Sequence, residues 1–271
     1  MMRALRPVLI FLALSGVSPA IVGLPAAELL PAFDQANRLY EQGQFTNAAA
    51  VYDQLIRAGH GSATLHFNLG NAWFKAGQKG RALAAYRQAQ QLAPRDPSVR
   101  FNLQFVRQQV TGSDTVRRPL WHRFLATLTL NEWTLLATAG WWLWLGLLAL
   151  REFRPDLRSA LRGYTATAGL GVALLGGCLG AAIYQETASR AAVVVVPSVV
   201  VRRGPLGESQ VFYQLRDGSE VTVLDEKPVS DTESWLQVRD DARRVGWLKH
   251  DQVVVLPRAS FQQALVEAQS R

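Results

Sequence analysis

Residues 133–150 read WTLLATAGWWLWLGLLAL and residues 163–185 read GYTATAGLGVALLGGCLGAAIYQ, and neither run contains a charged residue. A hydrocarbon core of about 30 Å requires roughly 20 residues of helix at a rise of about 1.5 Å per residue. The alternative is a pair of helices in a soluble core, but such helices are usually shorter and polar on one face. The runs therefore predict transmembrane helices over 132–150 and 163–185, joined as a hairpin by the arginine-rich loop 151–162.

The two predicted spans have complementary surfaces. Trp141 and Trp144 share one face of the first span, and Gly169, Gly176 and Gly180 lie at helical spacing on the second. In lipid, small residues allow two helix backbones to approach closely. We therefore expect the tryptophans to pack into a glycine groove. The alternative places the tryptophans against lipid, although tryptophan prefers the membrane interface to the bilayer centre.

Residues 1–20 have the pattern of a secretory signal peptide. Arg3 and Arg6 form a positive head, an apolar stretch too short to span a bilayer follows, and small residues precede a cleavage site near Ala20. The alternative is an uncleaved membrane anchor. In both cases the next segment is exported, so the loop 151–162 is expected in the cytoplasm, in agreement with the positive-inside rule.

Residues 29–110 contain a repeat with a period of 34 residues. The matching pairs are Ala36 and Gly70, Asn37 and Asn71, Tyr40 and Phe74, Gly43 and Gly77, Ala48 and Ala82, and Tyr52 and Tyr86. This period and pattern are typical of the tetratricopeptide repeat, which consists of two antiparallel helices. Two full repeats and a capping helix over about 97–110 are short for such an array, because stability usually requires about three units. We therefore expect the array to dock on a partner or on a second copy.

The first helix of each repeat is expected to line a groove that binds a partner. The candidate residues are Phe33, Asn37, Tyr40, Phe67, Asn71, Phe74, Lys75 and Phe101. The asparagines resemble those with which tetratricopeptide domains hold a peptide backbone. The alternative is that the aromatic residues pack between helices and that the asparagines are ordinary helix-surface residues.

After a linker over 111–131 and the two spans, residues 191–257 change to short runs of β-forming residues separated by turns. Such runs predict a small all-β barrel, and they resemble a bacterial SH3 domain in "VVVRRGP" and "VGWL". Trp235 and Trp247 are either core residues or the candidate ligand surface of this domain. Residues 258–271 form a polar, weakly helical tail.

Composition excludes several classes of function. The net charge is +8, but residues 191–271 hold ten basic and eleven acidic residues, and the basic excess lies near the N-terminus and the apolar runs. Without a dense basic stripe in a folded region, we expect no nucleic-acid partner. The four histidines and the single cysteine, Cys178, lack metal-binding spacing. No nucleophile–histidine–acid order or phosphate-binding loop stands out. We expect no catalytic residues, no metal and no cofactor, and hence no enzyme.

The order of signal peptide, short tetratricopeptide array, two spans and SH3-like domain resembles the BatE proteins of the bacterial aerotolerance (Bat) operon, most specifically in "FNLGNAWFKAG" and the SH3 pattern. The resemblance implies a multidomain, non-catalytic protein of the bacterial inner membrane with both soluble domains in the periplasm. It also implies partners among Bat proteins with von Willebrand factor A domains and a MoxR-type ATPase. The leading hypothesis is a membrane-anchored scaffold that binds proteins through the array. The alternative is an envelope sensor whose SH3-like domain binds peptidoglycan peptide.

Overall fold

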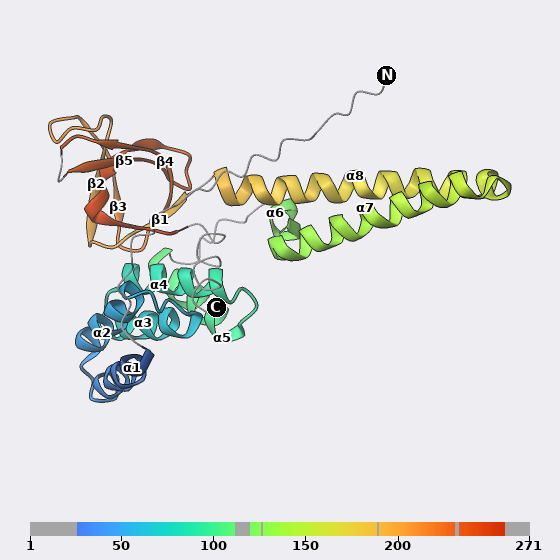
Figure 1. Ribbon diagram of the computed structural model, residues 1–271. Helices are drawn as coiled ribbons and strands as arrows, with labels where there is room; N and C mark the ends of the chain where they lie inside the picture. The colour runs from blue at the N-terminus through green and yellow to red at the C-terminus, as the bar shows by residue number, and fades with distance from the viewer. Residues whose placement is uncertain (1–25, 112–119, 126, 189, 231–232, 258–271) are drawn as a thin grey trace, which may run out of the picture.

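The computed structural model describes residues 26–111, 120–125, 127–188, 190–230 and 233–257 (Figure 1). The predicted signal peptide 1–20 and tail 258–271 therefore lie outside the described residues, as does part of the linker. Five helices are followed by a short helix, two long helices and a sheet of seven strands. The helices are α1 (Ala26–Glu41), α2 (Phe45–Arg57), α3 (Ala63–Lys75), α4 (Lys79–Leu92), α5 (Pro97–Thr111), α6 (Leu120–Leu125), α7 (Leu130–Phe153) and α8 (Arg158–Ala188).

The first five helices form an array in which consecutive helices pack side by side. Gly43 and Gly77 end the first helix of each repeat with φ values of 76° and 80°, a conformation that favours glycine. Small residues on the contact faces bring the helices together. A Cβ at Gly70 would lie only 2.7 Å from the ring of Tyr86, and Ala48 and Ala82 are completely buried. The 34-residue period of the sequence is therefore a period of helix packing.

Helices α7 and α8 form the predicted hairpin, which extends away from the rest of the protein (Figure 1). Thr129 and Glu132 form a capping box that begins α7. The short 3-10 helix η1 (Pro155–Leu157) turns the chain into α8. Both helices extend beyond the predicted spans, so only Arg154 and η1 separate them. Both are long and apolar enough to cross a membrane.

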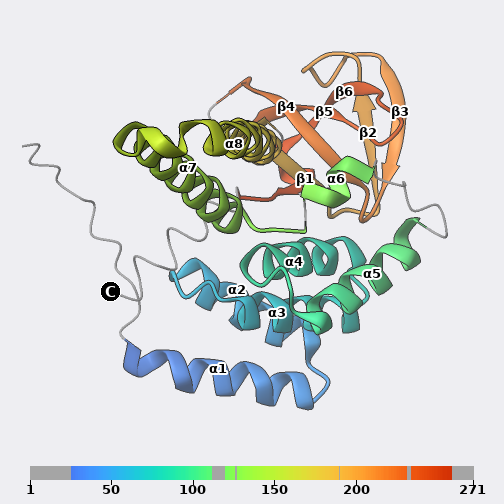
Figure 2. The same ribbon diagram turned by 90° about the vertical axis from the view of Figure 1, so that its right-hand side faces the viewer.

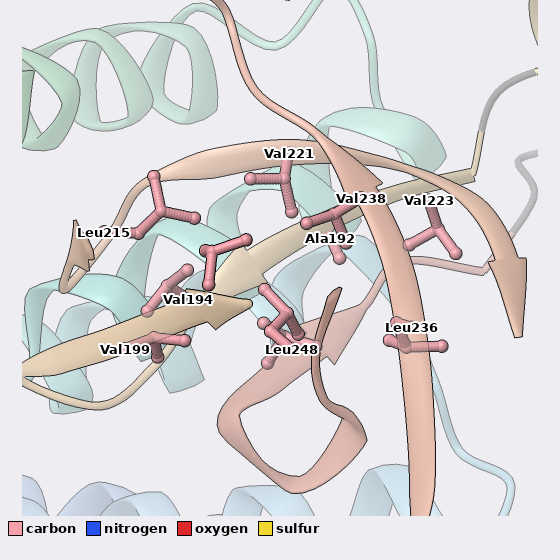
Figure 3. Packing of buried hydrophobic residues seen from close by; sticks show 11 residues of the cluster. Ala192, Val194, Val199, Leu215, Val221, Val223, Leu236, Val238 and Leu248 are labelled. Carbon is pink, nitrogen blue, oxygen red and sulfur yellow. The ribbon is translucent and has the colours of Figure 1, made fainter. Parts of the chain in front are cut away.

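The last described part is an antiparallel β-sheet with the strand order β3-β2-β6-β5-β4-β1-β7. Its strands are β1 (Arg190–Val194), β2 (Ser198–Arg202), β3 (Val211–Arg216), β4 (Glu220–Pro228), β5 (Ser234–Arg239), β6 (Val245–Lys249) and β7 (Val253–Val255). The break between β1 and β2 contains Pro197, which cannot donate a hydrogen bond to a strand ladder. Figure 3 shows valine and leucine side chains from both halves of the sheet meeting in one core.

The β-sheet packs directly on the helical array, and the two share a hydrophobic core. Val193 of β1 and Leu256 lie in one buried cluster with Leu83 of α4 and with Leu103 and Val106 of α5. Figure 2 shows α4 between the rest of the array and the sheet. Helix α5 begins a third repeat without a second helix in the described part of the chain. The sheet β1–β7, with the loops between its strands, is called the β-domain below. Its residues Val193 and Leu256 cover the side of α4 and α5 on which a second helix of the third repeat would pack, so the β-domain caps the short array.

A partly buried ion cluster reinforces this interface. Glu220, the first residue of β4, accepts hydrogen bonds from Arg87 of α4 and, at 2.5 Å, from Nε of Arg107 of α5. Asp217 accepts one at 3.0 Å from the backbone N–H of Gly80. Burial alone would raise the pKa of Glu220, but the two guanidinium groups outweigh it and lower the pKa from 4.5 to about 2. The carboxylate is therefore ionised and paired at neutral pH.

Candidate functional site

The candidate site is a groove of about 210 Å³ between α3 and α5, which we call the aromatic groove. Its walls come from the ends of α1 and α3, from α4, and from one face of α5. The lining residues are Tyr40, Asn71, Phe74, Lys75, Tyr86, Phe101, Asn102, Phe105 and Val106.

Three phenylalanines form the apolar side of the aromatic groove. Phe101 and Phe105 lie one turn apart on α5 with their rings stacked at 6.4 Å, and Phe74 meets Phe105 edge-on at 5.7 Å. Phe101 is 69% exposed and Phe105 is 42% exposed. Phenylalanines of a protein core are buried by other side chains. These two rings are not buried by any described residue, so they form an apolar surface in contact with solvent.

Two asparagine side chains form the polar side. The Oδ1 atom of Asn71 accepts a hydrogen bond of 2.6 Å from the hydroxyl of Tyr86 and one of 3.2 Å from Nδ2 of Asn102. Burial raises the pKa of Tyr86, so its hydroxyl remains a donor at every physiological pH. These bonds fix both amides in place. Within the described residues, the Nδ2 group of Asn71 and the Oδ1 atom of Asn102 have no hydrogen-bond partner.

The equivalent residues of the first repeat have a packing role. Asn37 accepts a hydrogen bond of 2.6 Å from the hydroxyl of Tyr52, which is the same bond that Asn71 accepts from Tyr86. Phe33 packs on Tyr52 at 6.0 Å, and Phe67 packs on Tyr86 at 5.8 Å. Phe33, Asn37 and Phe67 do not line the groove. The structure brings together the other candidates: Tyr40, Asn71, Phe74, Lys75 and Phe101.

The sequence reasoning missed Asn102, and with it Tyr86 and Val106, as residues of the groove. The repeat aligns Asn102 with Asn68, which does not line the groove, whereas the asparagine that Asn102 contacts is Asn71. Neighbouring first helices meet at an offset of 31 residues here, and a comparison at the period of 34 cannot find such a pair. Phe105 stands 34 positions after Asn71, where the repeat would have an asparagine. This difference is the sequence signal that the third unit departs from the repeat pattern.

The hairpin candidates divide into two groups. The indole of Trp144 donates a hydrogen bond of 3.0 Å to the carbonyl of Thr165, and a Cβ at Gly169 would lie 3.0 Å from that indole nitrogen. Trp141 contacts Trp144 edge-on at 5.6 Å. Gly176 and Gly180 face open space, with no described atom within 4 Å of a Cβ. Close contacts of α7 and α8 are therefore at Gly169 and at Gly140, where a Cβ would lie 3.2 Å from the side chain of Leu175, and not along the whole glycine stripe.

The two tryptophans of the β-domain have different environments. Trp235 is 2% exposed, with the ammonium of Lys249 at 5.7 Å from its ring, so it packs and offers no surface. Trp247 is half-buried on β6. On the edge strand β3, Arg203 lies over the exposed ring of Phe212 at 4.9 Å, and Arg244 lies over the half-buried ring of Tyr213 at 4.0 Å.

The described residues contain no cluster of three or more histidine, cysteine, aspartate or glutamate side chains suited to a metal ion. The buried histidine His66 has a pKa lowered by burial to about 4, so it is neutral, and it lies between helices rather than in the groove. The arrangement of the groove suits recognition of a polypeptide by apolar contact and hydrogen bonding.

Residues 33–97 match the family model of the tetratricopeptide repeat. The match confirms the repeat for the segment that contains α2, α3, α4 and most of α1, and tetratricopeptide repeats typically mediate protein–protein interaction. The comparison with curated proteins finds no match. The chain therefore carries a tetratricopeptide array, two apolar helices and an antiparallel β-domain.

Proposed function

We propose that the protein is a membrane-anchored scaffold that binds an extended segment of a partner protein in the aromatic groove. The observation that carries the proposal is the pair of amides fixed beside exposed phenylalanine rings. The two N–H donors of Asn71 and the carbonyl oxygen of Asn102 complement the C=O and N–H of a peptide unit. The rings then supply apolar contact for a neighbouring side chain of the partner, as concave helical-repeat surfaces do.

The exposure of α7 and α8 supports the membrane anchor. Only 6% of the most apolar window of α7 is buried, and none of that of α8. A core helix of a soluble protein would be mostly covered. On α8, the exposed residues Tyr164 and Tyr184 stand 20 positions apart. At about 1.5 Å per residue this spacing is about 30 Å, the thickness of the hydrocarbon layer, and aromatic residues favour its two boundaries.

The domain interface supports a topology in which both soluble domains lie on one side. Glu220, which follows α8, binds Arg87 and Arg107, which precede α7. A helical hairpin allows this contact, because the N-terminus of α7 and the C-terminus of α8 then lie on the same side of the membrane. The turn carries Arg151, Arg154, Arg158 and Arg162, which the positive-inside rule places in the cytoplasm. We therefore place the array and the β-domain outside the cytoplasm, on the bacterial inner membrane.

The resemblance to BatE proteins adds the class of partner. We propose that the β-domain is an SH3-like barrel and that the partners are Bat proteins with von Willebrand factor A domains, acting with a MoxR-type ATPase. A crosslinking pull-down from native membranes tests the scaffold. Phe101→Ser removes an exposed ring at little cost in stability, and the matched control Leu206→Ser changes a 57%-exposed residue of the β-domain. We expect Phe101→Ser to lose the captured protein and Leu206→Ser to retain it; equal capture by both would refute a binding role for the groove.

The second candidate is recognition of peptidoglycan peptide by the β-domain, which the exposed ring of Phe212 beside the half-buried Tyr213, with an arginine over each ring, favours. Sedimentation of the purified full-length protein with cell-wall sacculi tests this function. Phe212→Ser should reduce co-sedimentation, whereas Phe101→Ser should not. Failure of the wild-type protein to sediment would exclude this role.

A further inference from the structure

The short helix α6 presents an apolar face to the outside of the protein. Leu120, Trp121 and Phe124 are 79%, 54% and 57% exposed, whereas Leu125 is buried. At 3.6 residues per turn, the three exposed positions fall within about 100° of one another and share one side of the helix. Large apolar side chains grouped on one exposed face mark a contact with a partner or with a membrane.

Contacts with the hairpin fix the position of α6. The indole Nε1 of Trp133 donates a hydrogen bond of 3.1 Å to the carbonyl of Leu125, and the ring of Phe124 meets that indole edge-on at 5.8 Å. Helix α6 also contacts α8. Figure 1 shows α6 beside the first turn of α7, at the end of the hairpin from which the array and the β-domain extend. The apolar face of α6 is therefore held at the level of Trp133.

This level is the boundary between water and hydrocarbon in the topology proposed above. Glu132, one residue before Trp133, pairs at 2.8 Å with Arg95, which lies between α4 and α5. The uncharged run begins at Trp133, and Leu135 is already apolar and exposed. Aromatic side chains favour such a boundary, because an amphipathic ring has one part in the acyl chains and another among the headgroups.

We propose that α6 inserts its apolar face into the lipid surface of the leaflet from which the array and the β-domain emerge, and that it steadies the array there. The insertion rests on the membrane anchor proposed above. Helix α6 adds a lipid contact beside the hairpin, and the pair of Arg95 and Glu132 joins the array to the same level. Burial of apolar side chains at the headgroup boundary stabilises such interfacial helices. A protein partner on this face would instead have to lie within the headgroup layer.

The contact has a consequence for the aromatic groove. Helix α5 begins two residues after Arg95 and carries Phe101 on its second turn. The groove is thus held close to the bilayer and is presented to partners that are bound to the same membrane.

Site-directed spin labelling of the full-length protein in proteoliposomes tests the insertion. In a Cys178→Ala background, the label is attached to Leu120→Cys, to Leu143→Cys in the apolar run of α7, or to Leu206→Cys in the β-domain, all at exposed positions. Oxygen concentrates in lipid, and a nickel complex remains in water. We expect the ratio of oxygen to nickel accessibility at position 120 to lie roughly threefold or more above that at position 206, and below that at position 143.

The outcomes separate this proposal from the membrane anchor. A ratio at position 120 equal to that at position 206, with position 143 in lipid, would overturn the insertion and leave the anchor standing. An aqueous ratio at position 143 would overturn the anchor, and the insertion with it. Low accessibility of position 120 to both reagents would show a protein on this face, either a partner or a second copy, and would also overturn the insertion.

Single-molecule energy transfer from a dye on the array to an acceptor lipid tests the steadying role. The exposed position of Leu30→Cys on α1 carries the dye in the same background. Leu120→Ser combined with Trp121→Ser should broaden the distribution of transfer efficiencies, because the array then tilts about the hairpin. The matched control Leu206→Ser should leave the distribution as it is in the parent protein. An unchanged distribution in the double variant would refute the steadying role.

Discussion

The ion cluster at Glu220 gives the most quantitative prediction. Glu220→Gln keeps the shape of the side chain but removes the negative charge that Arg87 and Arg107 both contact. A shift in the pKa of this group from 4.5 to about 2 corresponds to about 3 kcal/mol of stabilisation at neutral pH. Loss of one partner from a buried ion pair costs ~3–5 kcal/mol. The arginine side chains are 18% and 28% exposed, so water can solvate the guanidinium groups in the variant and offset part of this cost. We therefore expect Glu220→Gln to lower the free energy of unfolding by ~2–3 kcal/mol.

Glu226→Gln is the matched control, because Glu226 lies on the same strand in an exposed pair with Arg190 at 3.4 Å. Such pairs contribute ~0–1 kcal/mol. Thermal unfolding of the detergent-solubilised full-length protein measures both variants. At ~2–4 °C per kcal/mol for this size, Glu220→Gln should lower the midpoint by roughly 4–12 °C, and Glu226→Gln by at most a few degrees. Adding Arg107→Gln to Glu220→Gln should cost little more, since the two groups act together. Equal small shifts for both glutamate variants would refute the claim that this cluster joins the domains.

Three further predictions follow from other contacts. Gly80→Ala places a Cβ against the carbonyl of Val194 and the carboxylate of Asp217, so it should separate the domains and raise the rate of limited proteolysis; Gly207→Ala, which meets open space, should not. Gly169→Leu should displace Trp144 and lower the thermal stability of the hairpin in detergent, whereas Gly176→Leu should leave it unchanged; equal effects would disprove the contact described here. Acid should destabilise the protein in two steps. The folded state resists protonation of His66, so stability falls by about 3 kcal/mol as the pH drops from 6.5 to about 4, and the Glu220 contribution is lost as the pH drops from 4.5 to about 2. Denaturant titrations at several pH values should show the upper step absent from His66→Gln.

The sequence was most informative where a pattern repeats along one element. The 34-residue period predicted the array, and its hydrogen bonds recur with it, from Tyr52 to Asn37 and from Tyr86 to Asn71. The charge-free runs predicted two long apolar helices. The short runs of β-forming residues over 191–257 predicted the strands that follow the hairpin. Each of these features depends on residues close together in the chain, and local spacing is visible in one sequence.

Contacts between residues far apart in the chain could not be predicted from local spacing. Glu220 meets Arg107 across 113 positions, and neither residue stands out in composition or spacing. The sequence therefore predicted that the short array needs a partner, but not that the β-domain is that partner. The expected glycine groove failed at Gly176 and Gly180 for a related reason: helical spacing gives a face, and only the crossing geometry decides where two faces touch.

The cap on the array has a consequence for biogenesis. A ribosome finishes α5 well before it makes Val193 and Leu256, and both apolar helices come in between. In the topology proposed above, the helical array would wait with one flank uncovered until the hairpin has been inserted and the β-domain has reached the same side of the membrane. On that proposal, correct insertion of the hairpin is a condition for completing the core that the array and the β-domain share.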